Sequence, residues 1–135
     1  MTYLLDSDFC IALLRGKAPP LSQLIPRAKS PTDIMICTIV VAELLCGAKK
    51  STRVTQSMQD VNNFIAPFKV LDFDLASAEA YAEIRADLEK VGTPIGANDP
   101  FIAAIALANN LTLVTSNLTE FSRVPNLQIL NWRTP

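Results

Sequence analysis

Short apolar runs alternate with longer segments of helical periodicity along this chain. Apolar and β-branched runs bounded by turn residues predict strands, here at Tyr3–Leu5, Ile34–Cys37, Val70–Leu71, 111–116 and Leu127–Leu130. Apolar residues at three- and four-residue spacing predict helices, here at about Ser7–Arg15, Leu21–Lys29, 38–50, Thr52–Ala66, Leu75–Val91 and from Asn98 onward. Because parallel neighbours need helical crossovers, this order predicts an α/β sandwich with a largely parallel sheet, formed by one domain over residues 1–135.

Residues at the predicted helix ends support these boundaries. Thr38 is expected to cap the helix that follows Ile34–Cys37. Pro67 is expected to stop the helix at Thr52–Ala66. Gly92 is expected to end the long helix from Leu75, since glycine accepts the left-handed conformation of a helix C-terminus.

Polar residues follow several of the predicted strands. Asp6 comes directly after the first strand, and Asn117 comes just after the strand at 111–116. Glu43 lies about a turn and a half into the helix that follows the second strand, and Asp99 opens a helix. In open parallel sheets, sites form beyond the carboxyl ends of the strands. We therefore expect these side chains to converge on one edge of the sheet.

Helix capping offers a simpler explanation for several of these residues. Asp6 is suited to cap the helix that begins near Ser7, and Asp99 lies in an Asn-Asp-Pro helix opening. Asn117 and Glu120 have the spacing of a capping box. Glu43 resists this explanation, because it lies in an apolar run on the face of a core-facing helix. A charge on that face is unfavourable by several kcal/mol unless it is paired or binds metal, although it can also snorkel or pair with a lysine.

The chain contains no histidine. This excludes catalytic triads with an imidazole base, metal-free RNA cleavage by paired histidines, and the commonest zinc ligand. Carboxylates remain, and they are the ligands that Mg²⁺ and Mn²⁺ prefer. Three carboxylates at one edge would repel one another unless cations bind among them, and such a cluster is sufficient for metal-assisted phosphodiester hydrolysis.

Charge and cysteine content limit the class of protein further. A net charge of −1 argues against a protein that coats nucleic acid non-specifically. Lys49, Lys50 and Arg53 cluster, either as an edge of a phosphate-contacting rim or, more simply, as cations favoured at a helix C-terminus. The three cysteines are expected to be reduced and buried. With no signal peptide and no membrane-spanning stretch recognised, a cytoplasmic protein is expected.

Four segments together resemble the signature blocks of PIN-domain ribonucleases, and more narrowly of the VapC toxins of bacterial toxin–antitoxin systems. The segments are LDSD from Leu5, VAELLCGA from Val41, GAND from Gly96, and LVTSNLTEF from Leu113. YAEIRADLEKVGTPIGANDPFIAA and EFSRVPNLQILNW strengthen the narrower resemblance, which covers essentially the whole chain.

This resemblance implies an α/β/α fold and Mg²⁺- or Mn²⁺-dependent endonucleolytic cleavage of RNA. By position, Asp6, Glu43 and Asp99 match the metal-binding acids, Asn117 the fourth site residue and Glu120 a further acid. The resemblance also implies a VapB antitoxin, a toxin homodimer, and a substrate similar to initiator tRNA cut in its anticodon stem-loop.

Two other functions compete with this one. A catalytically silent PIN-like interaction module would bind an antitoxin without cleaving RNA, but its carboxylates would be expected to erode. A phospho-acceptor signalling domain needs an Asp at the end of a central strand and a Lys after a later one. Asp99 opens a helix instead, and no Lys follows the strand at 111–116. Departures from the family pattern, such as Asp8 in place of Asn and Ser7 in place of Thr, bear on substrate choice more than on metal binding.

Overall fold

The sheet of this protein is parallel throughout the residues that the computed structural model describes, which are 2–18 and 33–134. Five strands lie in the order β3-β2-β1-β4-β5, with β1 at the centre. Their bounds are β1 Tyr3–Leu5, β2 Ile34–Cys37, β3 Lys69–Leu71, β4 Thr112–Thr115 and β5 Ile129–Asn131. The predicted α/β fold with a parallel sheet is confirmed, with strand ends shifted by one or two residues.

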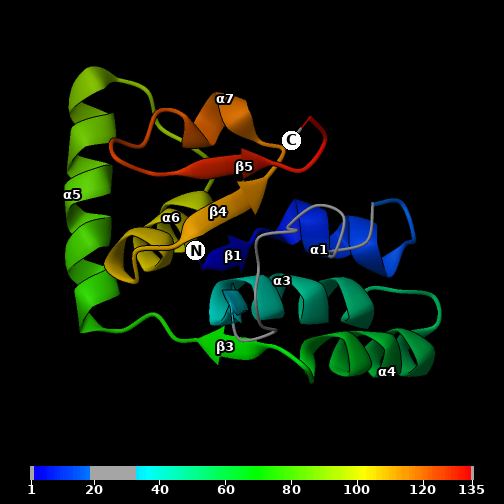
Figure 1. The fold of residues 1–135 in the computed structure, drawn as a ribbon. Helices are drawn as coiled ribbons and strands as arrows, with labels where there is room; N and C mark the ends of the chain where they lie inside the picture. The colour runs from blue at the N-terminus through cyan, green and yellow to red at the C-terminus, as the bar shows by residue number, and fades with distance from the viewer. Residues whose placement is uncertain (1, 19–32, 135) are drawn as a thin grey trace.

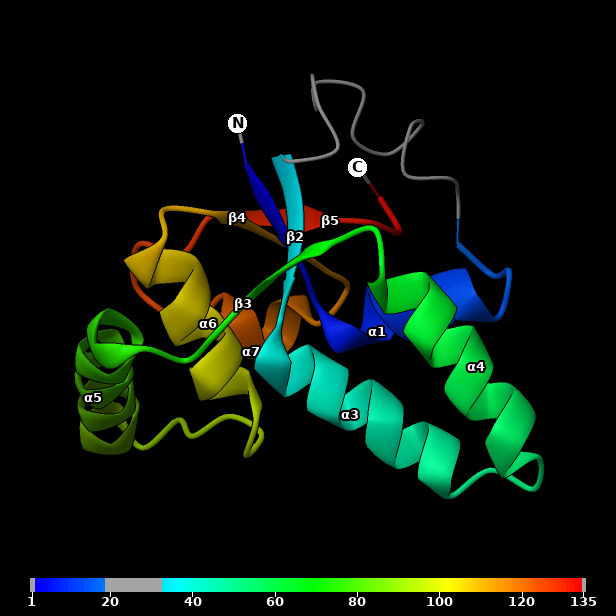
Figure 2. The same cartoon turned by 90° about the horizontal axis from the view of Figure 1, so that it is seen from below.

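Helices flank the sheet and link its strands (Figure 1). Their bounds are α1 Ser7–Leu14, α3 Thr38–Lys49, α4 Val54–Ile65, α5 Leu75–Val91, α6 Asp99–Ala108 and α7 Leu118–Phe121. Figure 2 shows two of the helix pairs, since α3 lies beside α4 and α5 lies beside α6. The helix predicted at Leu21–Lys29 falls outside the described residues.

The core explains why the central strands read as unbroken apolar runs. Leu4, Leu5, Leu113 and Val114 are completely buried, as expected for strands of a parallel sheet with both faces covered. Helix α6 is buried along residues 102–106, where its alanines allow close packing. These contacts make the sheet and α6 a rigid support for the residues at their ends.

Two details of the sequence prediction are wrong. Thr38 is the first residue of α3 rather than its cap, and Cys37 occupies the cap position without a capping side chain. Cys10 and Cys37 are buried, but Cys46 is exposed, because it lies on the outer face of α3. Gly92 ends α5 as predicted, with φ of 74° in the left-handed region.

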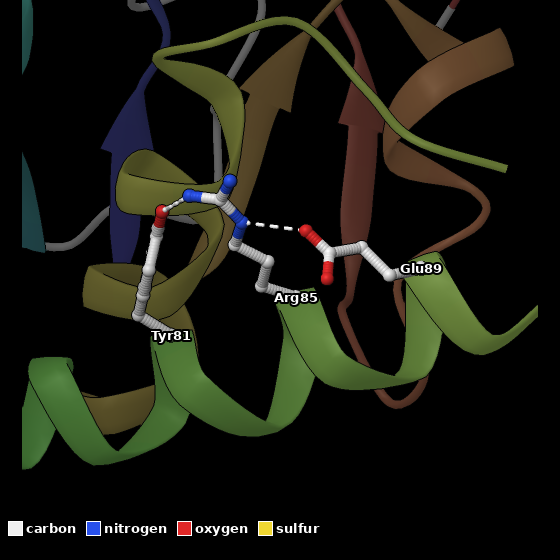
Figure 3. Close-up of polar contacts among 3 residues, drawn as sticks. All are labelled: Tyr81, Arg85 and Glu89. Atoms are coloured by element: carbon white, nitrogen blue, oxygen red, sulfur yellow. Dashed lines mark hydrogen bonds and ion pairs between the residues drawn. The ribbon is translucent and has the colours of Figure 1, made fainter. Parts of the chain in front are cut away.

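The solvent face of α5 carries an interaction network of its own (Figure 3). Arg85 donates from Nε to Glu89 Oε1 over 2.9 Å and from Nη1 to the Tyr81 hydroxyl over 2.6 Å. All three residues lie on one helix at four-residue spacing, so the network favours the helix itself. None of the helices in the described residues is long and apolar enough to cross a membrane.

Candidate active site

The predicted site residues follow strands that end at the same edge of the sheet. Because β1 lies between β2 and β4, the order of connections reverses there, and such a reversal opens a crevice at the carboxyl ends of the strands. Asp6 follows β1, α3 with Glu43 follows β2, and Asn117 follows β4. This topology brings residues from the two ends of the chain together.

Asp6 lies deepest among these acids, with only 5% of its surface exposed. It occupies the cap position of α1, yet its side chain makes no capping hydrogen bond. Its Oδ2 instead accepts a 2.7 Å hydrogen bond from the Thr115 hydroxyl at the end of β4. The capping explanation therefore does not account for this side chain.

Burial makes the negative charge of Asp6 unfavourable. The pKa of the carboxyl is raised from 3.8 to about 7, mainly by burial. The charges of Asp8 and Glu43 act in the same direction, and the hydrogen bond from Thr115 opposes them. A bound cation would reverse the balance, since it would favour the ionised carboxylate.

Glu43 is partly buried on the face of α3 that also buries Val40 and Leu44. Its Oε1 accepts a 2.9 Å hydrogen bond from the hydroxyl of Ser7, at the start of α1. The charge is thus held toward the crevice by a hydroxyl, and no described lysine forms an ion pair with it.

Asp99 opens α6 and is half-buried, but neither it nor Asn98 caps the helix with its side chain. The pKa of Asp99 is raised to about 8, mainly by burial. A hydrogen bond with Glu120 and the negative charges of Asp6, Glu120 and Glu43 act in the same direction. A cation bound at this edge of the sheet would therefore interact favourably with all of these acids.

Asn117 links the two acids of this half of the site. Its Nδ2 donates to Glu120 Oε2 over 2.9 Å and to Asp99 Oδ2 over 3.2 Å. Hydrogen bonds from Asp99 and Asn117 lower the pKa of the more exposed Glu120, whereas the pKa of Asp99 is raised, so Glu120 is the stronger acid of the two. The side chain of Asn117 makes no capping hydrogen bond, so the predicted capping box is wrong.

Gly96 lies against these two carboxylates. Its backbone N–H donates to Glu120 Oε1 over 3.2 Å, and a Cβ at this position would come within 3.3 Å of Asp99 Oδ2 and 3.4 Å of Glu120 Oε2. The absence of a side chain therefore permits the close approach of the loop before α6 to the site.

Hydroxyl residues are the partners that the sequence prediction did not single out. Ser7 and Thr115 hold Glu43 and Asp6, and Ser116 donates from its backbone N–H and its hydroxyl to Asp8 Oδ2. Asp8 thus fixes the turn after β4, and its Oδ1 is buried without a hydrogen-bond partner among the described residues. A Thr-Ser pair at the end of a buried strand is the signal that the sequence offers for these contacts.

The donor set fits a hard divalent cation in its chemistry. The site offers carboxylate, hydroxyl and amide groups, and no described lysine or arginine forms an ion pair with Asp6, Glu43, Asp99 or Glu120. Across residues 2–18 and 33–134, however, no three acidic or cysteine side chains are already gathered into a metal-binding group. Oxygen-only ligands with uncompensated negative charge favour Mg²⁺ or Mn²⁺ over softer metals.

Comparison with known proteins agrees with this geometry. The PIN domain profile matches residues 3–127. The chain is 39% identical to ribonuclease VapC2 of Rickettsia felis and 35% identical to the tRNA(fMet)-specific endonuclease VapC of Salmonella typhimurium, with 98% of each chain covered in both comparisons.

Solved structures give the same result. The VapBC2 complex of Rickettsia felis, bound to a promoter DNA fragment, contains a chain with a TM-score of 0.86 and 36% identity. That match covers 98% of this chain and 99% of the other. VapBC-1 of nontypeable Haemophilus influenzae gives a TM-score of 0.87 at 30% identity and covers 99% and 100% of the two chains. The chain belongs to the PIN-domain family, in the branch of the VapC ribonucleases.

Proposed function

We propose that this protein is the toxin of a VapBC-type toxin–antitoxin system and that it cleaves RNA with Mg²⁺, or with Mn²⁺ in its place, at the site of Asp6, Glu43 and Asp99. The observation that supports this most strongly is the buried carboxyl of Asp6, which lies among other acids and has a hydroxyl but no described cation as its partner. Such a group is unfavourable unless it serves to bind a positive ion.

Each residue has a proposed role at this site. Asp6, Asp99 and Glu43 would hold the cation, which when bound supplies Lewis-acid stabilisation of the phosphate and lowers the pKa of a water. Ser7 orients Glu43, and Thr115 orients Asp6. Asn117 orients Asp99 and Glu120 by donating from its amide to both, and Glu120 adds negative charge to the site.

Partners and substrate follow from the relatives. Solved relatives are VapBC toxin–antitoxin complexes, and we propose that a VapB-type antitoxin binds this chain, which itself forms a homodimer. Relatives at 35% and 30% identity are named tRNA(fMet)-specific endonucleases. We therefore propose initiator tRNA as the first substrate to test, with recognition of its unpaired anticodon loop rather than of a long basic groove.

Cleavage of RNA by the purified protein tests the activity. We expect cleavage with Mg²⁺ or Mn²⁺, loss of cleavage in EDTA, and new 5′-phosphate ends mapped by sequencing. Asp6→Asn and Asp99→Asn should abolish cleavage while Asp87→Asn, on the exposed face of α5, retains it. A protein that binds the antitoxin but cleaves no RNA under any of these conditions would instead be a catalytically silent PIN-like module.

The substrate is tested separately. In cells that express the toxin without the antitoxin, 5′-phosphate ends should accumulate in the anticodon stem-loop of initiator tRNA. Intact initiator tRNA together with ends in other RNAs would overturn this substrate and leave the ribonuclease activity standing.

A further inference from the structure

We propose that a hollow beside Glu43 binds a phosphate of the RNA strand next to the cleavage site and that Lys50 supplies the contacting cation. This proposal rests on the proposed ribonuclease function and adds to it the route by which the strand leaves the site. It concerns a residue outside the carboxylate cluster.

The hollow is bordered by Glu43, one of the predicted site residues, and by the neighbour of a second one. It has a volume of about 470 Å³ and lies along the outer face of α3, where Glu43 forms one part of its wall and Asn98, the neighbour of Asp99, forms another. The rest of the wall contains Lys50 and the side chains of Ile39, Ala42 and Cys46. A strand whose phosphate lies among the carboxylates therefore has an adjoining space that reaches Lys50.

The spacing between Glu43 and Lys50 suits this role. The two residues are seven positions apart, and Lys50 directly follows the last residue of α3. Two turns of helix place them on the same side and about 10 Å apart along the axis. A nucleic-acid strand covers that length within a few nucleotides. This spacing suits a contact between Lys50 and a phosphate next to the one that lies among the carboxylates.

Its position beside the hollow distinguishes Lys50 from the other basic residues of the cluster. The Lys50 side chain is exposed and forms no ion pair with a described acid. Lys49 and Arg53 complete the basic cluster seen in the sequence, yet neither lines the hollow. A favourable interaction with the C-terminus of α3 applies to Lys49 and Lys50 alike and does not explain why only Lys50 borders this space.

The opposite side of α3 is less suited to a phosphate. A second hollow of about 350 Å³ lies among α1, α3 and α4, and Glu43 borders it as well. Its wall contains a cation, Arg15, but also an anion, Asp60. Among the described residues that line the first hollow, Lys50 is the only charged one besides the proposed catalytic Glu43, so no further acid there offsets its positive charge.

Salt-dependent binding tests the proposal with a matched control. All variants carry Asp6→Asn to prevent cleavage, and binding of a fluorescent single-stranded RNA is measured by anisotropy over a series of KCl concentrations with Mg²⁺ held constant. Lys50→Gln should weaken binding several-fold and reduce the slope of log K against log salt by about 0.7, the value for one phosphate contact on a single strand. Lys50→Arg should keep the slope, and Lys49→Gln, which removes the same charge one residue away, should leave it unchanged.

Cleavage kinetics with intact Asp6 provide a second readout. Lys50→Gln should raise KM several-fold with little change in kcat, because the contact is made equally in the ground state and the transition state. A fall in kcat with unchanged KM would contradict a remote binding role and overturn the proposal.

The possible results distinguish failure of the phosphate site from failure of the proposed ribonuclease function. If the protein with native Lys50 cleaves and binds RNA but the salt slope is the same with Gln at this position, the phosphate site is overturned and the ribonuclease stands. If the protein neither binds nor cleaves RNA, both are overturned. If sedimentation shows that Lys50→Gln changes the association of two copies while the salt slope stays constant, the hollow belongs to a protein interface and the proposal fails.

Discussion

The two halves of the candidate site hold their acids in different ways. On the sheet side, Asp6 and Glu43 each accept a hydrogen bond from a hydroxyl, donated by Thr115 and Ser7. On the loop side, Asp99 and Glu120 are bridged by the amide of Asn117, and the backbone of the loop before α6 lies against them.

The two halves therefore differ in what metal binding has to change: the position of the side chains or their protonation. The sheet-side acids are oriented by neutral donors on buried strands and helices, so their position depends little on whether a metal is bound. On the loop side the pKa of Asp99 is raised to about 8 while that of Glu120 is lowered, so Asp99 must lose a proton at neutral pH before it can act as a ligand. Metal binding at neutral pH should therefore release protons, mainly from Asp6 and Asp99.

Removal of the charge at the centre of the sheet side should have the largest effect. Asp6→Asn should reduce cleavage by about 10³-fold, the order lost when a group that stabilises transition-state charge is removed. The metal-free variant should nevertheless unfold at a higher temperature than the original protein at pH 8, because a buried charge is gone. A variant that loses both activity and stability would indicate a structural role for Asp6.

The pH dependence of the metal-free protein should reveal the acids of both halves. The pKa values of Asp6 and Asp99 are raised to about 7 and about 8 in the folded protein, so between pH 4 and 8 the folded state binds more protons than the unfolded state. Stability should then fall as pH rises through this range. For Asp6 the shift corresponds to about 4 kcal/mol at most, and we expect Tm to fall by about 5–10 °C from pH 5 to pH 8.

Calorimetry in EDTA measures this fall, and Mg²⁺ should remove most of it by stabilising the ionised acids. Asp6→Asn should flatten the profile of the metal-free protein. A Tm that rises from pH 5 to pH 8 in EDTA would contradict the burial of these charges.

Loss of one hydroxyl should weaken the sheet side without removing a ligand. Thr115→Val keeps the shape of the buried side chain but removes the donor to Asp6, which should raise the pKa of Asp6 further and weaken metal affinity by about 10–100-fold. Isothermal titration calorimetry with Mn²⁺ measures the affinity for the metal. Thr115→Ser retains the hydroxyl and should bind metal as the original protein does; equal losses in both variants would argue against a role for the hydroxyl.

A third acid on the loop side should sharpen the contrast between the metal-free and metal-bound states. Asn117→Asp replaces the amide donor with a carboxylate beside Asp99 and Glu120, so the metal-free protein should lose about 1–2 kcal/mol of stability at pH 8. The increase in Tm caused by Mg²⁺ should become larger than in the original protein. An unchanged response to Mg²⁺ would place Asn117 outside the metal environment.

The smallest effect on cleavage is expected at Gly96, where the loop before α6 lies against two carboxylates. Gly96→Ala places a methyl group about as close to Asp99 and Glu120 as side chains tolerate, and should lower kcat several-fold with little change in stability. A kcat equal to that of the original protein would show that the loop before α6 can shift to accommodate the methyl group.

The sequence was sufficient to predict the elements and their convergence, because apolar runs, helix periodicity and Gly92 are local signals. It also predicted that Asp6, Glu43, Asp99 and Asn117 would gather at one edge, and the family resemblance added Glu120 to them. Their hydrogen-bond partners were not predictable in the same way. Whether Asp6 caps α1 or accepts from Thr115 depends on a strand pairing more than a hundred residues away, and local spacing favoured the cap.

The pairing of Asp6 with Thr115 also limits when the site can form during synthesis of the chain. The hydrogen bond joins residues 109 positions apart, and Asp8 reaches Ser116 over 108. During synthesis the aspartate emerges more than a hundred residues before its threonine partner. Until the segment with Thr115 and Ser116 has been made, the growing chain cannot assemble the site.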